Sequence, residues 1–484
     1  MTYWVCGHII RMYMLLERRA FIVSDFEEKY DETLEKLEEL FNEKRFNELK
    51  KEFSALYPTD IAFLLDDMPE EYRPVMFRLL PKDIAADVFV ELESDSQEML
   101  IKSFSNTELE SILDELYLDD TVDIIEEMPS NVVKRILKYS DPDTRKEINK
   151  ILQYPEDSAG SIMTTEFIKL RQYNTVAEAF DIIRKNGDEA ETINVCYVTD
   201  EGCHLQGYVT IRTLVLEKNT AAKIGDIMDT QVISVSTRED KEDVAQDMSK
   251  YDFDAMPVVD SENRIVGIVT FDDAIDVMEE EATEDIEKMA AITPMDKPYL
   301  RTSTFELWKA RIPWLLLLMI SATFTGMIIT SFEDALASYV ALTAFIPMLM
   351  DTGGNSGSQA SVTVIRGISL QEIEFKDIFK VIWKELRVAV FCGITLAAVS
   401  FVKIMLFDGM VLGNTGITPV VALTVCLTLV LTVICAKIVG CIMPLLAEKL
   451  GFDPAVMASP FITTIVDAIS LLIYFGFAKA MLGI

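Results

Sequence analysis

Histidine is almost absent from this sequence, and its cysteines form no paired motif. Only His8 and His204 occur in 484 residues, so a histidine-based zinc site or histidine acid–base chemistry is not expected. The seven cysteines include no C-x-x-C pair, which is typical of a reduced, cytosol-facing protein. Bases are also scarce, because 44 Lys and Arg stand against 79 Asp and Glu. The resulting net charge of −35 repels nucleic acid and attracts cations, so no nucleic-acid partner is expected.

The charge is unevenly distributed along the chain. Residues 312–484 hold 11 acids and 9 bases, which leaves 68 acids and 35 bases for residues 1–311. The nearly neutral part contains five apolar stretches long enough to cross a bilayer as helices. They lie at roughly 312–332, 335–365, 388–407, 416–446 and 453–483. Because the bases flank one side of these stretches, the positive-inside rule predicts a plasma-membrane protein with cytosolic N-terminal domains and an external C-terminus.

The predicted fold is multidomain, with an all-α cytosolic superhelical array, an α/β pair of repeats and an all-α five-helix transmembrane domain. Residues 1–26 are expected to be an extension of uncertain role. Eight successive 12-residue units begin at residues 57, 69, 81, 93, 105, 117, 129 and 141, each with a capping residue followed by apolar residues at helical spacing. They predict stacked short helices within an acidic N domain over 27–154.

Two tandem β-α-β-β-α patterns follow, at 155–223 and 224–276, and they resemble a pair of CBS domains. The second copy has Gly267, Val269, Thr270 and Asp273 in a G-x-V-[ST]-x-x-D pattern. The resemblance implies that Thr270 and Asp273 contact an adenine nucleotide such as ATP. The first copy has Thr213 where the acid would be, and a pair used only for packing and dimerisation is the alternative.

The acidic stretch from 277 to 311 is expected to connect this pair to the membrane. Its helical part is crowded with carboxylates, which repel one another and raise each other's proton affinity unless cations lie between them. A solvated face is the ordinary explanation of such a charge run. Its position between a sensor-like pair and the first span favours a cation-sensitive coupling helix.

The last apolar segment, within the transmembrane domain of 312–484, carries a polar stripe. Ser459, Thr463, Asp467 and Ser470 are spaced 4, 4 and 3 residues apart, so they lie on one side of a helix. A carboxylate near the bilayer centre is costly in lipid, so Asp467 should face the bundle interior or a water-filled ion route. An interhelical hydrogen bond is the alternative.

Glycine and polar residues also appear within the second span, over 347–367. Gly353, Gly354 and Gly357 are predicted to interrupt the helix, with Asn355 making the interruption polar. Irregular polar backbone at this depth is tolerated only inside protein or against a wet cavity. A surface turn between two helices is the alternative.

Two motifs, G-G-N-x-G-x-Q from Gly353 and D-P-A-V-x-x-x-P-x-x-T-T-x-x-D from Asp453, make the chain resemble the MgtE-type magnesium channels and transporters. The resemblance covers about residues 30–484 and includes the order of domains. It implies a homodimer in the lipid bilayer, a pore on the dimer axis with Asp467 as its acid, and closure by cytosolic Mg²⁺. Ser459 stands where the family has asparagine. The expected ion path comprises Asp467, Thr463, Thr464, Ser459, Asn355 and Gly354.

The resemblance also implies cytosolic magnesium ligands in three places. They are Asp87, Asp119 and Asp123 in the array, Asp240, Glu242, Asp252, Asp273 and Asp276 in the second CBS-like copy, and Glu281, Glu284 and Asp285 in the connecting helix. The function expected is therefore Mg²⁺ entry down its electrochemical gradient, with other divalent cations as further candidates, and no enzyme activity. The alternatives are a membrane-anchored divalent-cation or adenine-nucleotide sensor and a metal-dependent membrane enzyme.

Overall fold

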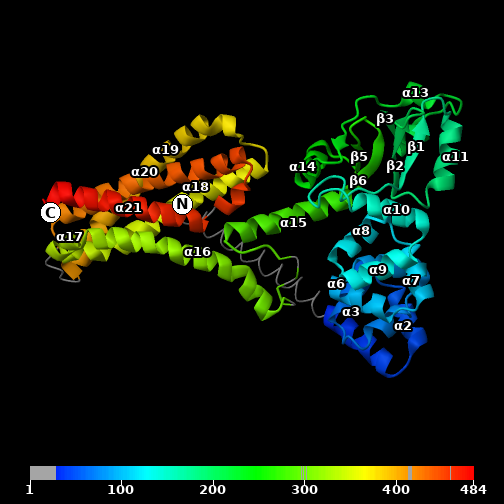
Figure 1. Cartoon of the computed structure of the whole chain (residues 1–484), viewed down its shortest axis with the longest axis horizontal. Coiled ribbons are helices and arrows are strands. Elements are labelled where there is room, and N and C mark those ends of the chain that lie inside the picture. Colours follow the sequence, from blue (N-terminus) through cyan, green and yellow to red (C-terminus); the bar gives the residue numbers. More distant parts are fainter. Residues whose placement is uncertain are drawn as a thin grey trace, which may run out of the picture. The chain divides into compact units, whose positions relative to one another are not determined.

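The computed structural model of the chain describes residues 29–483, apart from 296, 298, 301, 412–416 and 458. The chain divides into two compact units, Met1–Ile275 and Asp276–Ile484, which we describe separately (Figure 1). The predicted extension, residues 1–26, lies outside the described residues.

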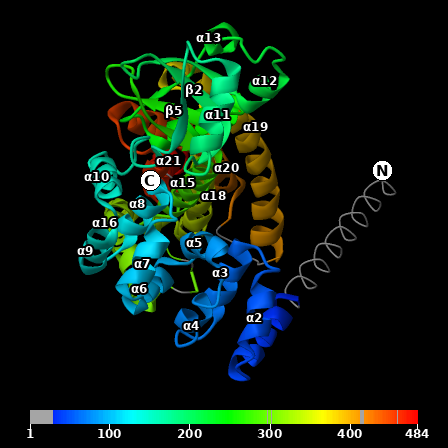
Figure 2. The same cartoon turned by 90° about the vertical axis from the view of Figure 1, so that its right-hand side faces the viewer.

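The first unit begins with the helical array that the 12-residue repeat predicts. A helix over residues 29–42 and α2 (Phe46–Phe53) precede one helix for each predicted unit. These are α3 (Pro58–Asp67), α4 (Arg73–Phe77), α5 (Lys82–Val90), α6 (Ser94–Ser103), α7 (Asn106–Leu113), α8 (Leu118–Glu127), α9 (Ser130–Tyr139) and α10 (Pro142–Ile151). Residues at the start of a unit specify where its helix begins: the capping box of Ser105 and Glu108 starts α7, and Asp141 caps α10. Figure 2 shows the short helices stacked on one another, which confirms the predicted array.

The two CBS-like copies have the same sheet topology. In the first, β1 (Phe167–Arg171) pairs parallel with β2 (Thr192–Thr199), which pairs antiparallel with β3 (Leu205–Thr210). In the second, β4 (Val235–Ser236), β5 (Ala255–Val259) and β6 (Ile265–Thr270) repeat that order. The helices of the copies are α11 (Val176–Asn186), α12 (Ile211–Leu216), α13 (Ile224–Ile227) and α14 (Lys241–Tyr251).

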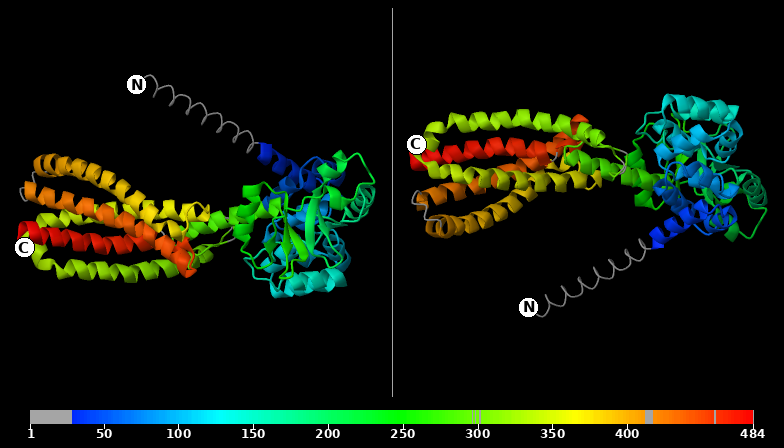
Figure 3. Two further views of the ribbon diagram at one scale, coloured as in Figure 1. Left: turned by 90° about the horizontal axis from the view of Figure 1, so that it is seen from above. Right: turned by 90° about the horizontal axis from the view of Figure 1, so that it is seen from below.

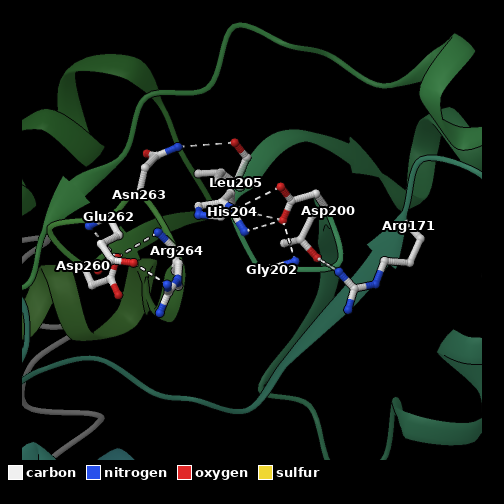
Figure 4. A network of polar contacts seen from close by, with 10 residues as sticks. Arg171, Asp200, Gly202, His204, Leu205, Asp260, Glu262, Asn263 and Arg264 are labelled. Atoms are coloured by element: carbon white, nitrogen blue, oxygen red, sulfur yellow. Dashed lines mark hydrogen bonds and ion pairs between the residues drawn. The ribbon is translucent and has the colours of Figure 1, made fainter.

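The two copies are joined through equivalent hairpins (Figure 4). Leu205 N donates to Asn263 O at 3.0 Å, and Ile265 N donates to Cys203 O at 3.0 Å. In each hairpin one aspartate, Asp200 or Asp260, accepts from backbone N–H groups of its own turn. A shared apolar core lies behind the hairpins, and within it Tyr197 Oη donates to Ala255 O at 3.0 Å. The pair is therefore one packed body.

Among its described residues, the second unit has long helices that lie lengthwise beside one another (Figure 3). They are α16 (Thr304–Ser331), α18 (Ile346–Ser369), α19 (Ile378–Lys403), α20 (Pro419–Leu450) and α21 (Ser459–Leu482). The short α17 (Glu333–Ser338) and η1 (Val340–Phe345) precede α18, and the π-helical η3 (Ile404–Val411) follows α19. By length and composition, four of the described helical segments could cross a membrane, namely Thr304–Ser331, Phe375–Val411, Pro419–Leu450 and Pro454–Leu482. Helix α18 corresponds to the remaining predicted span and is more polar.

The connecting helix is continuous with the last helix of the second CBS-like copy. Helix α15 runs from Phe271 to Met289 without interruption, so the proposed domain boundary at residue 276 lies inside it. The sequence of α15 contains neither proline nor glycine, so no residue in it favours a break.

The prediction that the glycines break the second span was wrong. Residues 346–369 form one unbroken α-helix, so neither irregular backbone nor a surface turn occurs there. The reason is tertiary: Gly353, Gly354 and Gly357 are buried, and each lies where a neighbouring helix approaches too closely for a side chain. The helix keeps its own backbone hydrogen bonds, and the glycines supply room for packing.

Candidate ion path and cation sites

The polar stripe of α21 packs against α18. A β-carbon at Gly354 would lie 2.9 Å from Thr463 Cγ2, and one at Gly353 would lie 3.0 Å from Ser470 Oγ. The distance at Gly354 is shorter than real β-carbons show and the one at Gly353 is tighter than most contacts, so glycine at both positions lets the two helices meet as they do. The structure therefore brings Gly354 and Thr463, two residues of the expected ion path, into direct contact.

Asp467 lies half-buried on α21 and interacts electrostatically with Asp351 of α18. Thr463 and Thr464 donate their hydroxyl hydrogens to Pro460 O, at 2.9 and 3.0 Å. Their oxygen lone pairs are still able to accept. The side chain of Ser459 lies outside the described residues.

One face of α18 is polar and exposed in the single chain. Asp351, Asn355 and Gln359 follow one another at four-residue spacing and are all exposed, and Asn355 Nδ2 donates to Asp351 Oδ1 at 3.1 Å. At membrane depth, an exposed carboxylate and two amides are costly against lipid. This face therefore requires water or protein beside it.

Helix α20 fixes the other side of α18. A β-carbon at Gly440 would lie 2.2 Å from Gly357 O, so the two backbones touch at this crossing. About one turn earlier on the same helix, Lys437 Nζ lies 3.3 Å from Glu385 Oε2 of α19, and the two side chains are only 6% and 14% exposed. Helix α20 is thus held to α18 by backbone contact and to α19 by a buried ion pair.

A second candidate site lies in the first unit, where the array meets the CBS-like pair. Asp119 and Asp120 of α8 interact electrostatically with Glu191, just before β2, and with Asp273 of α15. We call these four residues the acidic cluster. The start of α8 is also joined to the first copy, because Leu118 N donates to Glu166 Oε2 at 3.2 Å. The array and the pair therefore meet through carboxylates.

Burial and mutual repulsion make ionisation of the acidic cluster unfavourable. Burial, followed by the charge of Asp273, raises the pKa of Asp119 well above its ordinary value. The same two causes raise the pKa of Asp120 to about 7. Burial and the charge of Asp120 raise the pKa of Glu191 to about 8. Glu191 Oε2 is buried and has no hydrogen-bond partner among the residues that the structure describes. A cation or protons would relieve this repulsion.

The other expected ligands are dispersed. Asp240 caps the start of α14, where Glu242 also lies, whereas Asp252 ends the same helix in a left-handed conformation. Asp123 and Asp276 are exposed on α8 and α15, and exposed Asp87 of α5 contributes to the charge that acts on Asp120. Across the described ranges, no three Asp, Glu, His or Cys side chains converge closely enough to hold a bare metal ion.

The sequence analysis did not predict that Glu191 belongs to the acidic cluster or that Glu166 contacts the start of α8. Both acids belong to the first CBS-like copy, which was expected to matter only through its missing nucleotide-binding acid. Glu189 and Glu191 precede β2 in a run of acids, and that run was the available signal. Its approach to α8 depends on tertiary packing.

We predict that acidification stabilises the protein when divalent cations are chelated. Because Asp120 and Glu191 have raised pKa values when folded, this contribution to stability is fully present below their ordinary pKa values near 4 and is lost as pH rises towards about 8. Thermal unfolding of the full chain in EDTA should therefore occur at a lower temperature at pH 8 than at pH 6. The double variant Asp120→Asn/Glu191→Gln should reduce this difference, whereas Glu127→Gln, an exposed position on α8, should not. An unchanged pH dependence in the double variant would contradict the prediction.

Known protein families match the regions of the chain that contain both candidate sites. A family model described as MgtE, a divalent cation transporter, matches residues 346–477. The MgtE intracellular N domain matches residues 56–157, and CBS domain models match 159–218 and 224–280. The acidic cluster falls within the N-domain and CBS matches, and α18 and most of α21 fall within the transporter match.

Full-length relatives and a solved domain are also similar to this chain. The magnesium transporter MgtE of Thermus thermophilus is 36% identical over 449 residues, which cover 92% of this chain and 98% of that protein. The magnesium transporter MgtE of Bacillus subtilis is 35% identical over 457 residues, covering 94% and 98%. The crystal structure of the cytosolic domain of the Mg²⁺ channel MgtE in complex with ATP is 37% identical, covers 50% of this chain and 98% of that one, and has a TM-score of 0.48.

Proposed function

The chain belongs to the MgtE family of divalent cation transporters, and on that premise we propose that it admits Mg²⁺ into the cell through a path lined by α18 and α21. It is a multi-pass membrane protein of a transporter family, so we assign it no enzymatic reaction. We further propose that its acidic N-terminal domains are cytosolic and its C-terminus external. Lys376, Lys380 and Lys384 lie between α18 and α19 or in the first turns of α19, and the positive-inside rule places such a basic segment in the cytosol.

The observation that carries the proposal is the exposed polar face of α18 beside Asp467. A single chain leaves Asp351, Asn355 and Gln359 without cover, and a second copy on a twofold axis would place two such faces and two Asp467 side chains around one path. Mg²⁺ holds its water tightly and prefers oxygen ligands, so a path with few carboxylates and many amide and hydroxyl oxygens suits a hydrated ion. We therefore propose a homodimer with the path between the two copies.

The acidic cluster supports closure by cytosolic Mg²⁺. Its donors are all carboxylates, the ligand type that Mg²⁺ takes, and Glu191 Oε2 is a buried acceptor without a hydrogen-bond partner in the described part of the chain. Asp119, Asp120, Glu191 and Asp273 would hold the ion through retained water, which accords with their loose spacing. Bound Mg²⁺ would allow α8 and the CBS-like pair to stay together. At low Mg²⁺ these carboxylates repel and the contact loosens, which we propose opens the path.

We also propose that ATP binds at the second CBS-like copy. Thr270 Oγ1 donates to Asp273 Oδ2 at 2.6 Å, whereas in the first copy Thr210 Oγ1 lies 3.0 Å from Thr213 Oγ1 and no carboxylate is present. Only the second copy therefore offers the acceptor that a ribose hydroxyl requires. Asp273→Asn should weaken ATP binding to the full chain about tenfold, the effect of losing one charged hydrogen-bond partner. Calorimetric titration would measure this, with Thr213→Val as the variant that should leave affinity unchanged. Equal affinity for ATP in the Asp273→Asn variant would rule out this site.

Mg²⁺ flux into proteoliposomes tests the function directly. The intact chain should admit Mg²⁺ when the cytosolic side contains little Mg²⁺, and the flux should fall as cytosolic Mg²⁺ is raised. Absence of flux from a correctly folded sample would contradict transport. Flux that ignores cytosolic Mg²⁺ would contradict the proposed closure alone.

A further inference from the structure

One lysine near the end of α15 contacts carboxylates from two elements. Lys288 Nζ lies 2.7 Å from Asp453 Oδ2 and also forms an ion pair with Glu284, one turn earlier on α15. Asp453 immediately precedes η4 (Pro454–Met457), the short helix that leads into α21, and its Oδ1 accepts from Ala455 N at 2.7 Å. The ammonium group therefore joins α15 to the segment that starts α21.

Apolar contacts beside this ion pair bring in α18 as well. Met289, the residue after Lys288, packs against a buried cluster formed by Ile365 of α18 and Ala455 of η4. The last turn of α15 thus touches the end of α18 and the short helix η4 that leads into α21.

A positive charge is needed at this position because the acids around it repel one another. Asp285 lies on the same turn of α15, and burial together with the charge of Asp453 raises the pKa of Asp285. Lys288 pairs with Glu284 and Asp453 and its charge acts on Asp285, so without it these three carboxylates would repel one another more strongly. The Lys288 side chain is only 23% exposed, so its charge is partly shielded from solvent screening.

We propose that Lys288 is a positioning residue, a covalently attached cation that keeps the end of α15 on α18 and on the η4 segment before α21, irrespective of the Mg²⁺ concentration. This inference rests on the proposed closure by cytosolic Mg²⁺ and on the expectation that the stretch after residue 276 couples the CBS-like pair to the membrane. It divides the expected carboxylate ligands of α15 into two groups. Glu284 serves the lysine contact, and Glu281 and Asp285 remain the candidates for Mg²⁺.

The test uses the full chain in proteoliposomes and two measurements. The first is the rate at which a bulky, water-soluble maleimide modifies Met289→Cys, read by peptide mass spectrometry so that native cysteines do not interfere. The second is Mg²⁺ flux at low and high cytosolic Mg²⁺. Lys288→Met removes the charge and keeps the length of the side chain, Lys288→Arg keeps the charge, and Lys288→Asp/Asp453→Lys exchanges the partners. Lys250→Met, which removes an exposed lysine paired with Asp247 on α14, is the matched control.

Lys288→Met should raise the modification rate and the flux remaining at high cytosolic Mg²⁺ by about five- to tenfold, as expected for loss of a partly buried charged contact. Lys288→Arg and the exchanged pair should restore both values, and Lys250→Met should change neither. Unchanged modification and flux in Lys288→Met would overturn the proposal, and so would an exchanged pair that folds yet behaves like Lys288→Met. If the unmodified chain shows flux insensitive to cytosolic Mg²⁺, the proposed closure fails, and the modification rates still decide the role of Lys288.

Discussion

Replacing Asp467 by alanine should reduce Mg²⁺ entry about a hundredfold, close to the leak of protein-free vesicles. Loss of one charged partner for a cation is worth on the order of 3 kcal/mol, which corresponds to about that factor. In the proposed dimer two such carboxylates are lost at once. Thr463 and Thr464 supply only neutral oxygens, and Asp351 lies on another helix, so neither replaces the missing charge. Proteoliposome flux at low cytosolic Mg²⁺ measures the effect.

Controls separate the charge of Asp467 from its place in the packing. Asp467→Asn keeps the shape and should lose nearly as much flux as alanine, whereas Asp467→Glu keeps the charge and should retain a measurable part. Asp408→Asn removes a carboxylate of η3 that is already paired with Lys403 at 2.7 Å, and it should leave flux nearly intact. Equal flux in the Asp467→Ala and unmodified proteins would remove Asp467 from the path.

Replacing Gly440 by alanine should destabilise the helical bundle more than the same change at Gly353 or Gly354, where the nearest atoms belong to side chains. The added carbon would lie 2.2 Å from Gly357 O, and a backbone carbonyl within a helix is unable to swing aside. Helices α18 and α20 would have to separate, at a cost of about 1–3 kcal/mol typical of overpacking. For a unit of this size, that cost lowers the melting temperature by roughly 3–10 °C. Thermal unfolding of the detergent-solubilised chain would detect the shift.

The chain contains its own matched controls for this effect. At Gly326 of α16 and Gly476 of α21, an added β-carbon would meet nothing within 4 Å. Gly326→Ala and Gly476→Ala should therefore keep or slightly raise the melting temperature, because alanine favours the helix over glycine. If Gly440→Ala has the same melting temperature as these two variants, the close crossing of α18 and α20 does not contribute to the stability of the bundle.

Local signals explain why the helical array was predicted so well. Caps such as Ser105 and Asp141 and the 12-residue period specify where each helix starts without reference to distant residues. The order of strands in the CBS-like copies was likewise predictable from alternating residues and turns. The glycines of α18 were interpreted wrongly because a glycine that breaks a helix and one that allows a close helix–helix contact can have the same local sequence. Only the presence of Gly440 and Thr463 on neighbouring helices distinguishes them.

Contacts between distant segments could not be anticipated in the same way. Asp467 was singled out because a carboxylate is rare in an apolar stretch, which is a local observation. Glu191 beside Asp120, and Lys288 beside Asp453, depend on how separate elements pack, and neither member of these pairs is unusual in its own neighbourhood.

The unbroken course of α15 gives it the properties of a mechanical lever. Its 19 residues span about 28 Å, with Asp273 in the first turn and Lys288 in the last. A tilt of about 10° at one end therefore displaces the other by about 5 Å if the helix remains stiff. Its stiffness is itself sensitive to ions, because Glu280 and Glu284, and likewise Glu281 and Asp285, are like charges four residues apart, which weakens a helix. Cations beside these acids would weaken this repulsion and make the lever more rigid.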